Sequence, residues 1–311
     1  MKGKLISGPK TGGSGKKSWI TKQQTKWGYI FIAPALLGMA LFSIGPILFS
    51  LAISFTKWDI VTPMEFIGLG NYSRLFQDEL VLKSIWATLY YTLLTVPTTL
   101  VVTFLMALLL NTKIKGMSVF RTIIYIPSII PVVASSAVWM YLYNPIYGLF
   151  DTILRNIGMA PVDFLFDRKA VIPSLAFMAV WGAGNTVVIY LAGLQGISGE
   201  LLEAAEVDGA NALQKLFKIK IPMMTPIIFY NLIMGIINCM QTFTQAYIMT
   251  EGGPENTSLF YALLLYRTAF KNSEMGYAAS MSWVLFVIIG ILTLLFFRTS
   301  GKWVYYESGD D

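Results

Sequence analysis

Four neutral polar side chains interrupt a long apolar stretch in the last third of the chain. They are Asn238, Gln241, Thr242 and Gln245. Their spacing of three, four and seven residues predicts that they share one face of a helix. An earlier apolar stretch carries Trp181 and Asn185, which stand four residues apart and are expected to share a face in the same way. Such groups can line a cavity for a polar ligand or bond neighbouring helices to each other, and the residues alone leave both interpretations open.

The chain lacks the residues on which most enzymes and metal sites depend. It has no histidine, and its single cysteine, Cys239, lies inside an apolar run, where a structural thiol is expected. No pair of carboxylates lies in an apolar stretch, so no acid–base or metal constellation is predicted. The segment Gly12–Ser18 departs from the phosphate-binding loop at its first glycine and at its Ser/Thr position. We therefore predict no catalytic residue, no metal site, no cofactor and no ATP hydrolysis by this chain.

Six apolar runs are long enough to cross a bilayer as helices, which requires about 20 residues each. Their ranges are Gly28–Phe55, Ser84–Leu110, Thr122–Tyr143, Ala170–Leu194, Met223–Thr250 and Met275–Phe297. None of them contains Asp, Glu, Lys or Arg, and only 13% of the 311 residues are charged. Helices are expected because each backbone polar group in lipid must be satisfied within its own segment. The composition thus predicts an all-α membrane protein with six transmembrane helices.

Basic residues indicate the orientation of these helices. If the N-terminus is cytoplasmic, 15 of the Lys and Arg residues lie on the inner side and 8 on the outer side. This bias follows the positive-inside rule, so both termini are expected in the cytoplasm. The net charge of +6 is then explained by topology, and nucleic-acid binding is not needed to account for it. A basic tail is predicted at 1–27, a transmembrane region at 28–299, and a second cytoplasmic tail at 300–311.

The longest charged segment between apolar runs spans residues 198–222, which we call the elbow. Ser198 is a suitable N-cap for a short helix that carries Glu200, Glu203 and Glu206. Gly209 is expected to end that helix, because glycine adopts the left-handed conformation at a helix C-terminus. Asn211, followed three residues later by Gln214, predicts a capping box for a second helix. The acidic side chains disfavour burial in an anionic inner leaflet, so docking on a protein is expected.

The elbow carries a specific family resemblance. Its residues Glu203-Ala204-Ala205, then Gly209, then Ile219-x-Ile221-Pro222 resemble the EAA motif of ABC-importer permeases. The spacing matches throughout, and only Ile221 departs, where the family has leucine. Asp208-Gly209-Ala210 and Thr250-x-Gly252-Gly253-Pro254 are similar to forms typical of the carbohydrate-uptake group, of the MalF/UgpA type. The resemblance extends from the first predicted span to the last.

This resemblance implies the type I importer permease fold with a MetI-like core, in the cytoplasmic membrane of a bacterium or archaeon. It implies partners as well: a second homologous permease, two cytoplasmic ATPase subunits and an external solute-binding protein. The residues that would couple to the ATPase are Glu203, Ala204, Ala205, Asp208 and Gly209. The residues that would line the path of a sugar, most simply an oligosaccharide, are Trp181, Asn185, Asn238, Gln241, Thr242 and Gln245.

An ion-coupled secondary transporter or a channel is the main alternative. Carriers of that kind usually place ionisable side chains within their spans, and the six predicted spans contain none. They are also often built from inverted repeats, and no internal repeat is evident. The sequence therefore favours the ATP-driven importer, while it does not identify the sugar.

Overall fold

The computed structural model describes residues 19–112 and 114–305 of the chain. Most of the predicted tail at 1–27 and residues 306–311 of the second tail therefore lie outside the described residues. Two compact units are distinguished, residues 1–52 and 53–311. The first contains α1 (Trp19–Met39), the π-helical turn η1 (Ala40–Ile44) and nearly all of α2 (Gly45–Ile53), which together form one uninterrupted apolar helix. Helical structure thus begins before Gly28, where the first span was expected.

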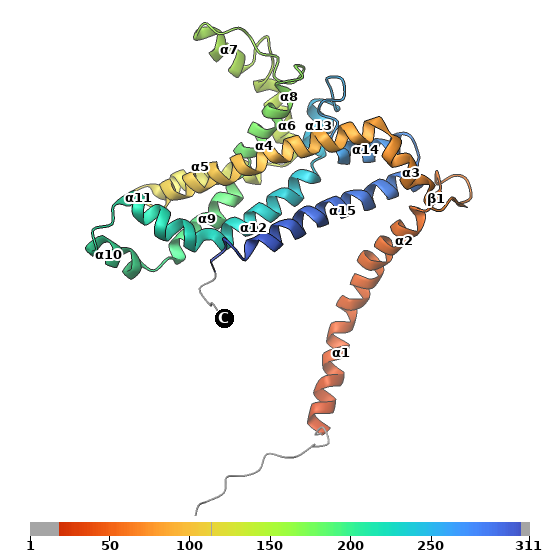
Figure 1. The fold of residues 1–311 in the computed structure, drawn as a ribbon, viewed down its shortest axis with the longest axis horizontal. Helices are drawn as coiled ribbons and strands as arrows, with labels where there is room; N and C mark the ends of the chain where they lie inside the picture. The colour runs from red at the N-terminus through yellow and green to blue at the C-terminus, as the bar shows by residue number, and fades with distance from the viewer. Residues whose placement is uncertain (1–18, 113, 306–311) are drawn as a thin grey trace, which may run out of the picture. The chain divides into compact units, whose positions relative to one another are not determined.

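The second unit is helical except for one small hairpin (Figure 1). Its early elements are β1 (Thr56–Lys57), β2 (Glu65–Phe66), α3 (Gly70–Gln77), α4 (Glu79–Leu110), α5 (Met117–Ile129), α6 (Val132–Leu142) and α7 (Leu149–Asn156). Its later elements are α8 (Val171–Trp181), α9 (Gly184–Gly196), α10 (Gly199–Val207), α11 (Ala212–Lys215), η2 (Leu216–Lys220), α12 (Ile221–Met240), α13 (Thr244–Met249), α14 (Tyr261–Tyr266), η3 (Arg267–Lys271) and α15 (Met275–Ser300). The strands β1 and β2 pair antiparallel.

Spanning helices occur where the apolar runs predicted them, but two of the six are sharply bent and a third has a short break. Four helical segments each count as one span, namely 25–53, 79–110, 212–249 and 275–300, although the third is interrupted between Met240 and Thr244. The α5–α6 pair bends by 101° and the α8–α9 pair by 48°, so the described chain has six spans if each bent pair counts as one. Pro131 explains the first bend, because the preceding Ile130 is held in an extended conformation. Gly182 and Ala183 form the second break.

The long helix α4 is the centre of the packing, with α8, α9, α12 and α14 against it. Tyr91 of α4 is buried beside Phe260, with ring centroids 4.8 Å apart. The backbone N–H of Tyr261 donates to the Thr88 hydroxyl, and the Tyr261 hydroxyl donates to the Met281 carbonyl. The range 251–274 lies between the fifth and sixth predicted spans, yet α14 within it is part of the core. Its apolar sequence YALLLY is the signal for that burial.

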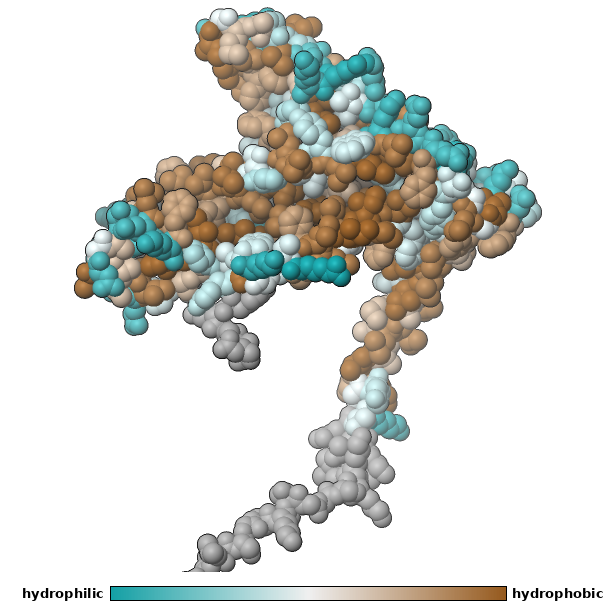
Figure 2. Space-filling view, viewed as in Figure 1, coloured by the Kyte–Doolittle hydropathy of each residue, from teal (hydrophilic) through white to brown (hydrophobic). Residues whose placement is uncertain are grey.

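The surface of the second unit fits a lipid environment. In Figure 2 hydrophobic side chains cover the flanks of α4 and α15, whereas hydrophilic side chains gather around α10 and α11. Leu93, Phe286 and Leu294 are large apolar side chains that the described chain leaves exposed. Wide apolar exposure of this kind is costly in water and normal in a bilayer. The fold is therefore that of a polytopic membrane protein.

Candidate functional site

The elbow has the helix–turn–helix geometry that its sequence predicts, although Ser198, at the N-cap position of α10, forms no side-chain capping bond. Gly209 has a φ of 83°, the left-handed conformation that glycine adopts without steric cost. The N–H of Gly209 donates to the Glu206 carbonyl, and the N–H of Ala210 donates to the Ala205 carbonyl at 2.8 Å. These bonds satisfy carbonyls that the end of α10 would otherwise leave unpaired. The capping box is confirmed as well, because Asn211 and Gln214 exchange two bonds of 2.8 Å.

The predicted coupling residues lie together on the surface of α10 and its turn. Glu203, Ala204, Asp208 and Gly209 are exposed, and Ala205 is half-buried. Sequence reasoning missed the apolar side chains of the same surface, of which Val207 is 89% exposed and Leu213 is 66% exposed. Val207 stands between Glu206 and Asp208 in the sequence, and Leu213 stands between Ala212 and Gln214. Exposed apolar groups beside small and acidic residues form a surface suited to a protein partner.

The polar side chains of the last third do not lie on one continuous helix as expected. The helix α12 ends at Met240, Phe243 leaves the helical conformation with a φ of −131°, and α13 starts at Thr244. Asn238 is therefore on α12, Gln241 and Thr242 are in the break, and Gln245 is on α13. The expectation of a shared helical face was wrong for Trp181 and Asn185 too, because α8 ends at Trp181 and α9 starts at Gly184.

Three helix breaks meet at one cavity of about 250 Å³, which we call the break cavity. Its polar and aromatic lining consists of Tyr91, Ser128, Ser135, Trp181, Asn238, Thr242 and Gln245. The α5–α6, α8–α9 and α12–α13 junctions all contribute to it. Non-helical backbone at membrane depth is tolerated where it lines a water-filled cavity or is buried in protein. The coincidence of three breaks therefore marks this cavity as the candidate site.

Hydrogen bonds and ring contacts orient the lining side chains. The Tyr91 hydroxyl donates to Gln245 Oε1 at 3.2 Å, and the Thr242 hydroxyl donates to the Asn238 carbonyl at 3.3 Å. Trp139 packs edge-on against Trp181, with 5.5 Å between ring centroids. The lining offers neutral donors, neutral acceptors and aromatic faces, and it contains no charged side chain. It can therefore bind a neutral polar group by hydrogen bonds and stacking.

Two of the predicted path residues lie beside the cavity and do not line it. Asn185 and Gln241 are both exposed and are absent from its lining. Conversely, Tyr91, Ser128 and Ser135 line it and were not singled out from the sequence. Their single polar atoms among apolar neighbours gave no periodic signal. In the described part of the chain, no three Asp, Glu or Cys residues are grouped so that they could hold a metal ion.

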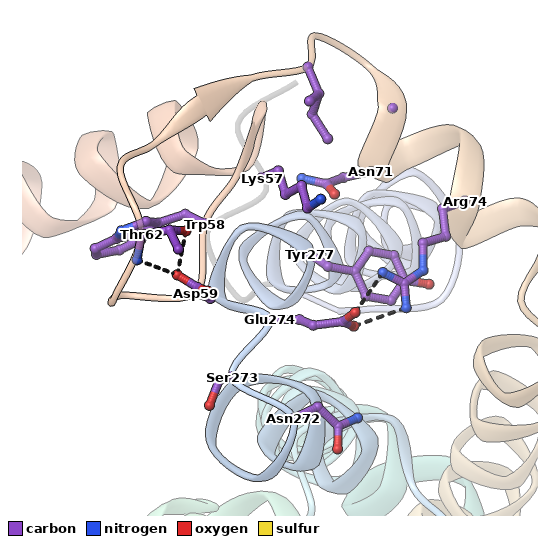
Figure 3. Close-up of a pocket in the computed structure, with 12 residues that line it drawn as sticks. Lys57, Trp58, Asp59, Thr62, Asn71, Arg74, Asn272, Ser273, Glu274 and Tyr277 are labelled. Carbon is purple, nitrogen blue, oxygen red and sulfur yellow. Dashed lines mark hydrogen bonds and ion pairs between the residues drawn. The ribbon is translucent and has the colours of Figure 1, made fainter.

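A second polar cluster ties the hairpin and α3 to the start of α15 (Figure 3). Arg74 forms two hydrogen bonds with Glu274, of 3.0 and 2.9 Å, and its guanidinium lies 4.0 Å from the centroid of the Tyr277 ring. The Tyr277 hydroxyl donates to Asp78 at 3.0 Å. The bonds to Glu274 raise the pKa of Arg74 above its ordinary value. Arg74, Glu274 and Tyr277 line a separate cavity of about 490 Å³. At the edge of that cavity, hydrogen bonds from Thr62 lower the pKa of Asp59.

Known proteins resemble this chain over nearly its full length. The family model of the binding-protein-dependent transport system inner membrane component matches residues 100–306. The probable ABC transporter permease protein YesP of Bacillus subtilis is 40% identical over 301 residues, which are 95% of this chain and 97% of the relative. The trehalose/maltose transport system permease protein MalF of Thermococcus litoralis is 29% identical, over 90% of this chain and 96% of that protein.

A solved structure shares the fold. A chain of a bacterial alginate ABC transporter, in complex with an alginate pentasaccharide-bound periplasmic protein, superposes with a TM-score of 0.81 at 21% identity. The match covers 92% of this chain and 97% of that one. The family favours an ATP-driven transporter over the ion-coupled alternative. The chain belongs to the binding-protein-dependent transport system inner membrane components, the permease subunits of ABC transporters.

Proposed function

We propose that this chain is one permease subunit of an ATP-driven sugar importer, and that an oligosaccharide is its usual cargo. The observation that carries the proposal is the break cavity, because a polar cavity at three helix breaks is joined by two continuous helices to the elbow. The helix α9 runs from the cavity to the elbow, and α11, η2 and α12 run from the elbow back to the cavity. ATP hydrolysis is assigned to a separate subunit.

The two connecting helices are packed closely enough to move as a pair. A Cβ added at Gly193 of α9 would lie 2.2 Å from Ile227 Cδ1 of α12, so a larger residue would require the Ile227 side chain to move. A displacement of the elbow would therefore be transmitted to both walls of the cavity at once. The breaks at Gly182–Ala183 and at Phe243 are where these helices can change direction without unpacking from α4.

The class of cargo is inferred from the lining and from the relatives. Trp181, Asn238, Thr242 and Gln245 supply one aromatic face and several neutral hydrogen-bonding groups, a combination that suits a polyhydroxylated ring. Relatives are named as permeases for trehalose/maltose, for arabinooligosaccharides and for multiple sugars. Asn185 and Gln241, exposed beside the cavity, would contact the second permease or complete the site with it.

The elbow is proposed to dock on one of two cytoplasmic ATPase subunits. Glu203 would pair with a basic residue of that subunit, and Ala204 and Ala205 would permit close approach. This placement requires both termini, with the tails at 1–27 and 300–311, to be cytoplasmic. An external solute-binding protein would deliver the sugar to the opposite face of the membrane.

The test is purification and reconstitution of the complete transporter. The wild-type chain is expected to co-purify with an ATPase subunit and a second permease, and its binding protein is expected to show a thermal shift with a sugar. Glu203→Lys should abolish sugar uptake while the protein remains in the membrane. Glu200→Lys, an equal charge change on the same helix but outside the motif, is the matched control. If the wild type never co-purifies with an ATPase, the proposal fails.

A further inference from the structure

A second cavity, of about 230 Å³, lies next to the break cavity on the side of the elbow. We call it the elbow-side cavity, and its polar lining consists of Thr95, Thr99, Thr186, Asn231 and Asn238. The two cavities share Ala179, Asn238 and Cys239 as a common wall. From α4, Tyr91 lines the break cavity, whereas Thr95 and Thr99 line the elbow-side cavity. From α12, Asn238 lines both cavities and Asn231 lines only the elbow-side cavity. On both helices the residues that line only the elbow-side cavity lie nearer the elbow.

The threonines of α4 divide into two groups by their hydrogen bonds. Thr88, Thr92, Thr98 and Thr103 each donate to the backbone carbonyl four residues earlier, which satisfies a hydroxyl within an apolar helix. Thr95 and Thr99, which line the elbow-side cavity, form no such bond in the described chain. Thr95 is 3% exposed, and its hydroxyl makes no well-formed hydrogen bond, although the Tyr91 hydroxyl lies close by.

An unpaired hydroxyl at membrane depth is costly unless a polar partner enters the cavity. Thr95 is therefore a buried hydroxyl that a polar group in the cavity would satisfy better than the neighbouring Tyr91 hydroxyl does. The opposite wall offers Thr186 of α9 and Asn231 of α12, whose side-chain amide donates to the Ile227 carbonyl at 3.0 Å and leaves its oxygen as an acceptor. All of these groups are neutral, which suits the hydroxyls of a sugar ring in the same way as the break cavity does.

Both volumes fall below the range of roughly 300–1,000 Å³ that small-molecule pockets usually have. Each cavity is thus suited to be one half of a site that a facing subunit completes. Asn238 is exposed between the two cavities, where its amide can contact a ring on either side.

We propose that the elbow-side cavity is a second saccharide-binding station, which receives a sugar ring from the break cavity before release on the side of the elbow. The inference rests on the proposed function, since it extends the same path. It assigns Thr95, Thr99, Thr186 and Asn231 to the cargo rather than to packing between helices.

The first measurement needs no sugar. In a Cys239→Ala background, Thr186→Cys places a thiol in the elbow-side cavity, and Thr98→Cys places one on α4 outside both cavities. A small water-soluble methanethiosulfonate is expected to modify the complete transporter much faster at position 186 than at position 98. Equal rates would mean that the cavity is dry and would overturn the proposal.

The second measurement is uptake into proteoliposomes that contain the complete transporter and its binding protein. Maltose, trehalose and arabinotriose serve as radiolabelled probes. The Thr99→Val/Thr186→Val variant is expected to lower the maximal rate about ten- to a hundredfold, because each of the two lost hydrogen bonds gives a factor of about three to ten. The half-saturating concentration should stay unchanged, because the break cavity is intact. Thr98→Val is the matched control and should transport like the wild type.

The outcomes separate the two proposals. If the wild type takes up a probe and the double variant takes it up equally fast, the second station is refuted while the importer stands. If the wild type takes up none of the probes and no ATPase co-purifies, the proposed function itself fails. If the double variant does not assemble, the rates of thiol modification at positions 186 and 98 decide whether the second station stands.

Discussion

Lys215 Nζ lies 3.0 Å from Glu206 Oε2, so an ion pair joins the two helices of the elbow across the turn at Gly209. Glu206 is exposed and Lys215 is half-buried, and an ion pair with an exposed partner contributes at most about 1 kcal/mol. The angle between the helices is therefore set mainly by the left-handed backbone of Gly209 and by the Asn211 capping box.

Gly209→Val is expected to reduce sugar uptake about tenfold. No atom lies within 4 Å of the position of an added Cβ, so the cost is one of backbone conformation and not of a clash. A side chain in the left-handed region costs roughly 1–2 kcal/mol, and 1.4 kcal/mol corresponds to a factor of ten. Gly209→Asn should retain most uptake, because asparagine tolerates this conformation. The assay is uptake per transporter in the membrane, and equal uptake by both variants would contradict the role of the turn.

Val207→Asp is expected to reduce the amount of ATPase that co-purifies with the chain. Val207 is 89% exposed on the elbow, so the aspartate would not disturb the fold and would place a charge in an apolar contact. Val61→Asp is the matched control, because Val61 is also 89% exposed but lies in the turn between β1 and β2. An equal loss of ATPase from both variants would show that Val207 does not mark the docking surface.

The same two valines test the topology. In a Cys239→Ala background, Val61→Cys is expected to react with a membrane-impermeant maleimide in intact cells. Val207→Cys should react only after lysis if the orientation inferred from the basic residues is right, because the elbow would then face the cytoplasm. Since both side chains are equally exposed, a difference in labelling reports the side of the membrane. Labelling of Val207→Cys in intact cells would reverse the proposed orientation.

Asn238→Leu is expected to raise the half-saturating sugar concentration about three- to tenfold, because it removes hydrogen-bonding groups from the walls of both cavities. Gln241→Leu is the comparison variant, since Gln241 is three residues away and lines neither cavity. It should shift the half-saturating concentration less. If Asn238→Leu reduces the amount of assembled transporter more than it reduces the uptake by each assembled transporter, a role in helix packing is favoured.

Gly276→Ala is expected to destabilise the second unit by about 1–3 kcal/mol, the usual cost of forcing extra atoms into a packed site. An added Cβ would lie 2.0 Å from the Thr56 carbonyl oxygen, where β1 crosses the start of α15. Gly290→Ala, on the same helix with open space at its Cβ position, should be neutral or slightly stabilising. Thermal unfolding in detergent compares the two variants. Equal unfolding midpoints would mean that the hairpin moves to accommodate the methyl group without loss of stability.

The sequence by itself determined the features that depend on local chemistry. Apolar runs free of charge predicted the spanning helices, because a helix in lipid must satisfy its own backbone. The elbow was predicted down to its turn and its capping box, because Gly209, Asn211 and Gln214 act on backbone groups a few residues away. The spacing from Glu203 to Pro222 also identified the family.

Only the tertiary structure decided which polar residues meet. The expectation from periodicity holds only for an unbroken helix. The breaks at Gly182–Ala183 and at Phe243 interrupt the helices, so periodicity could not place Asn185 and Gln241 correctly. The burial of Tyr261 and the cavity lining by Tyr91 depend on contacts between residues far apart in the chain, which no local pattern encodes. The sequence thus specified the helices and the elbow, whereas the position of the cavity follows from where three broken helices pack against α4.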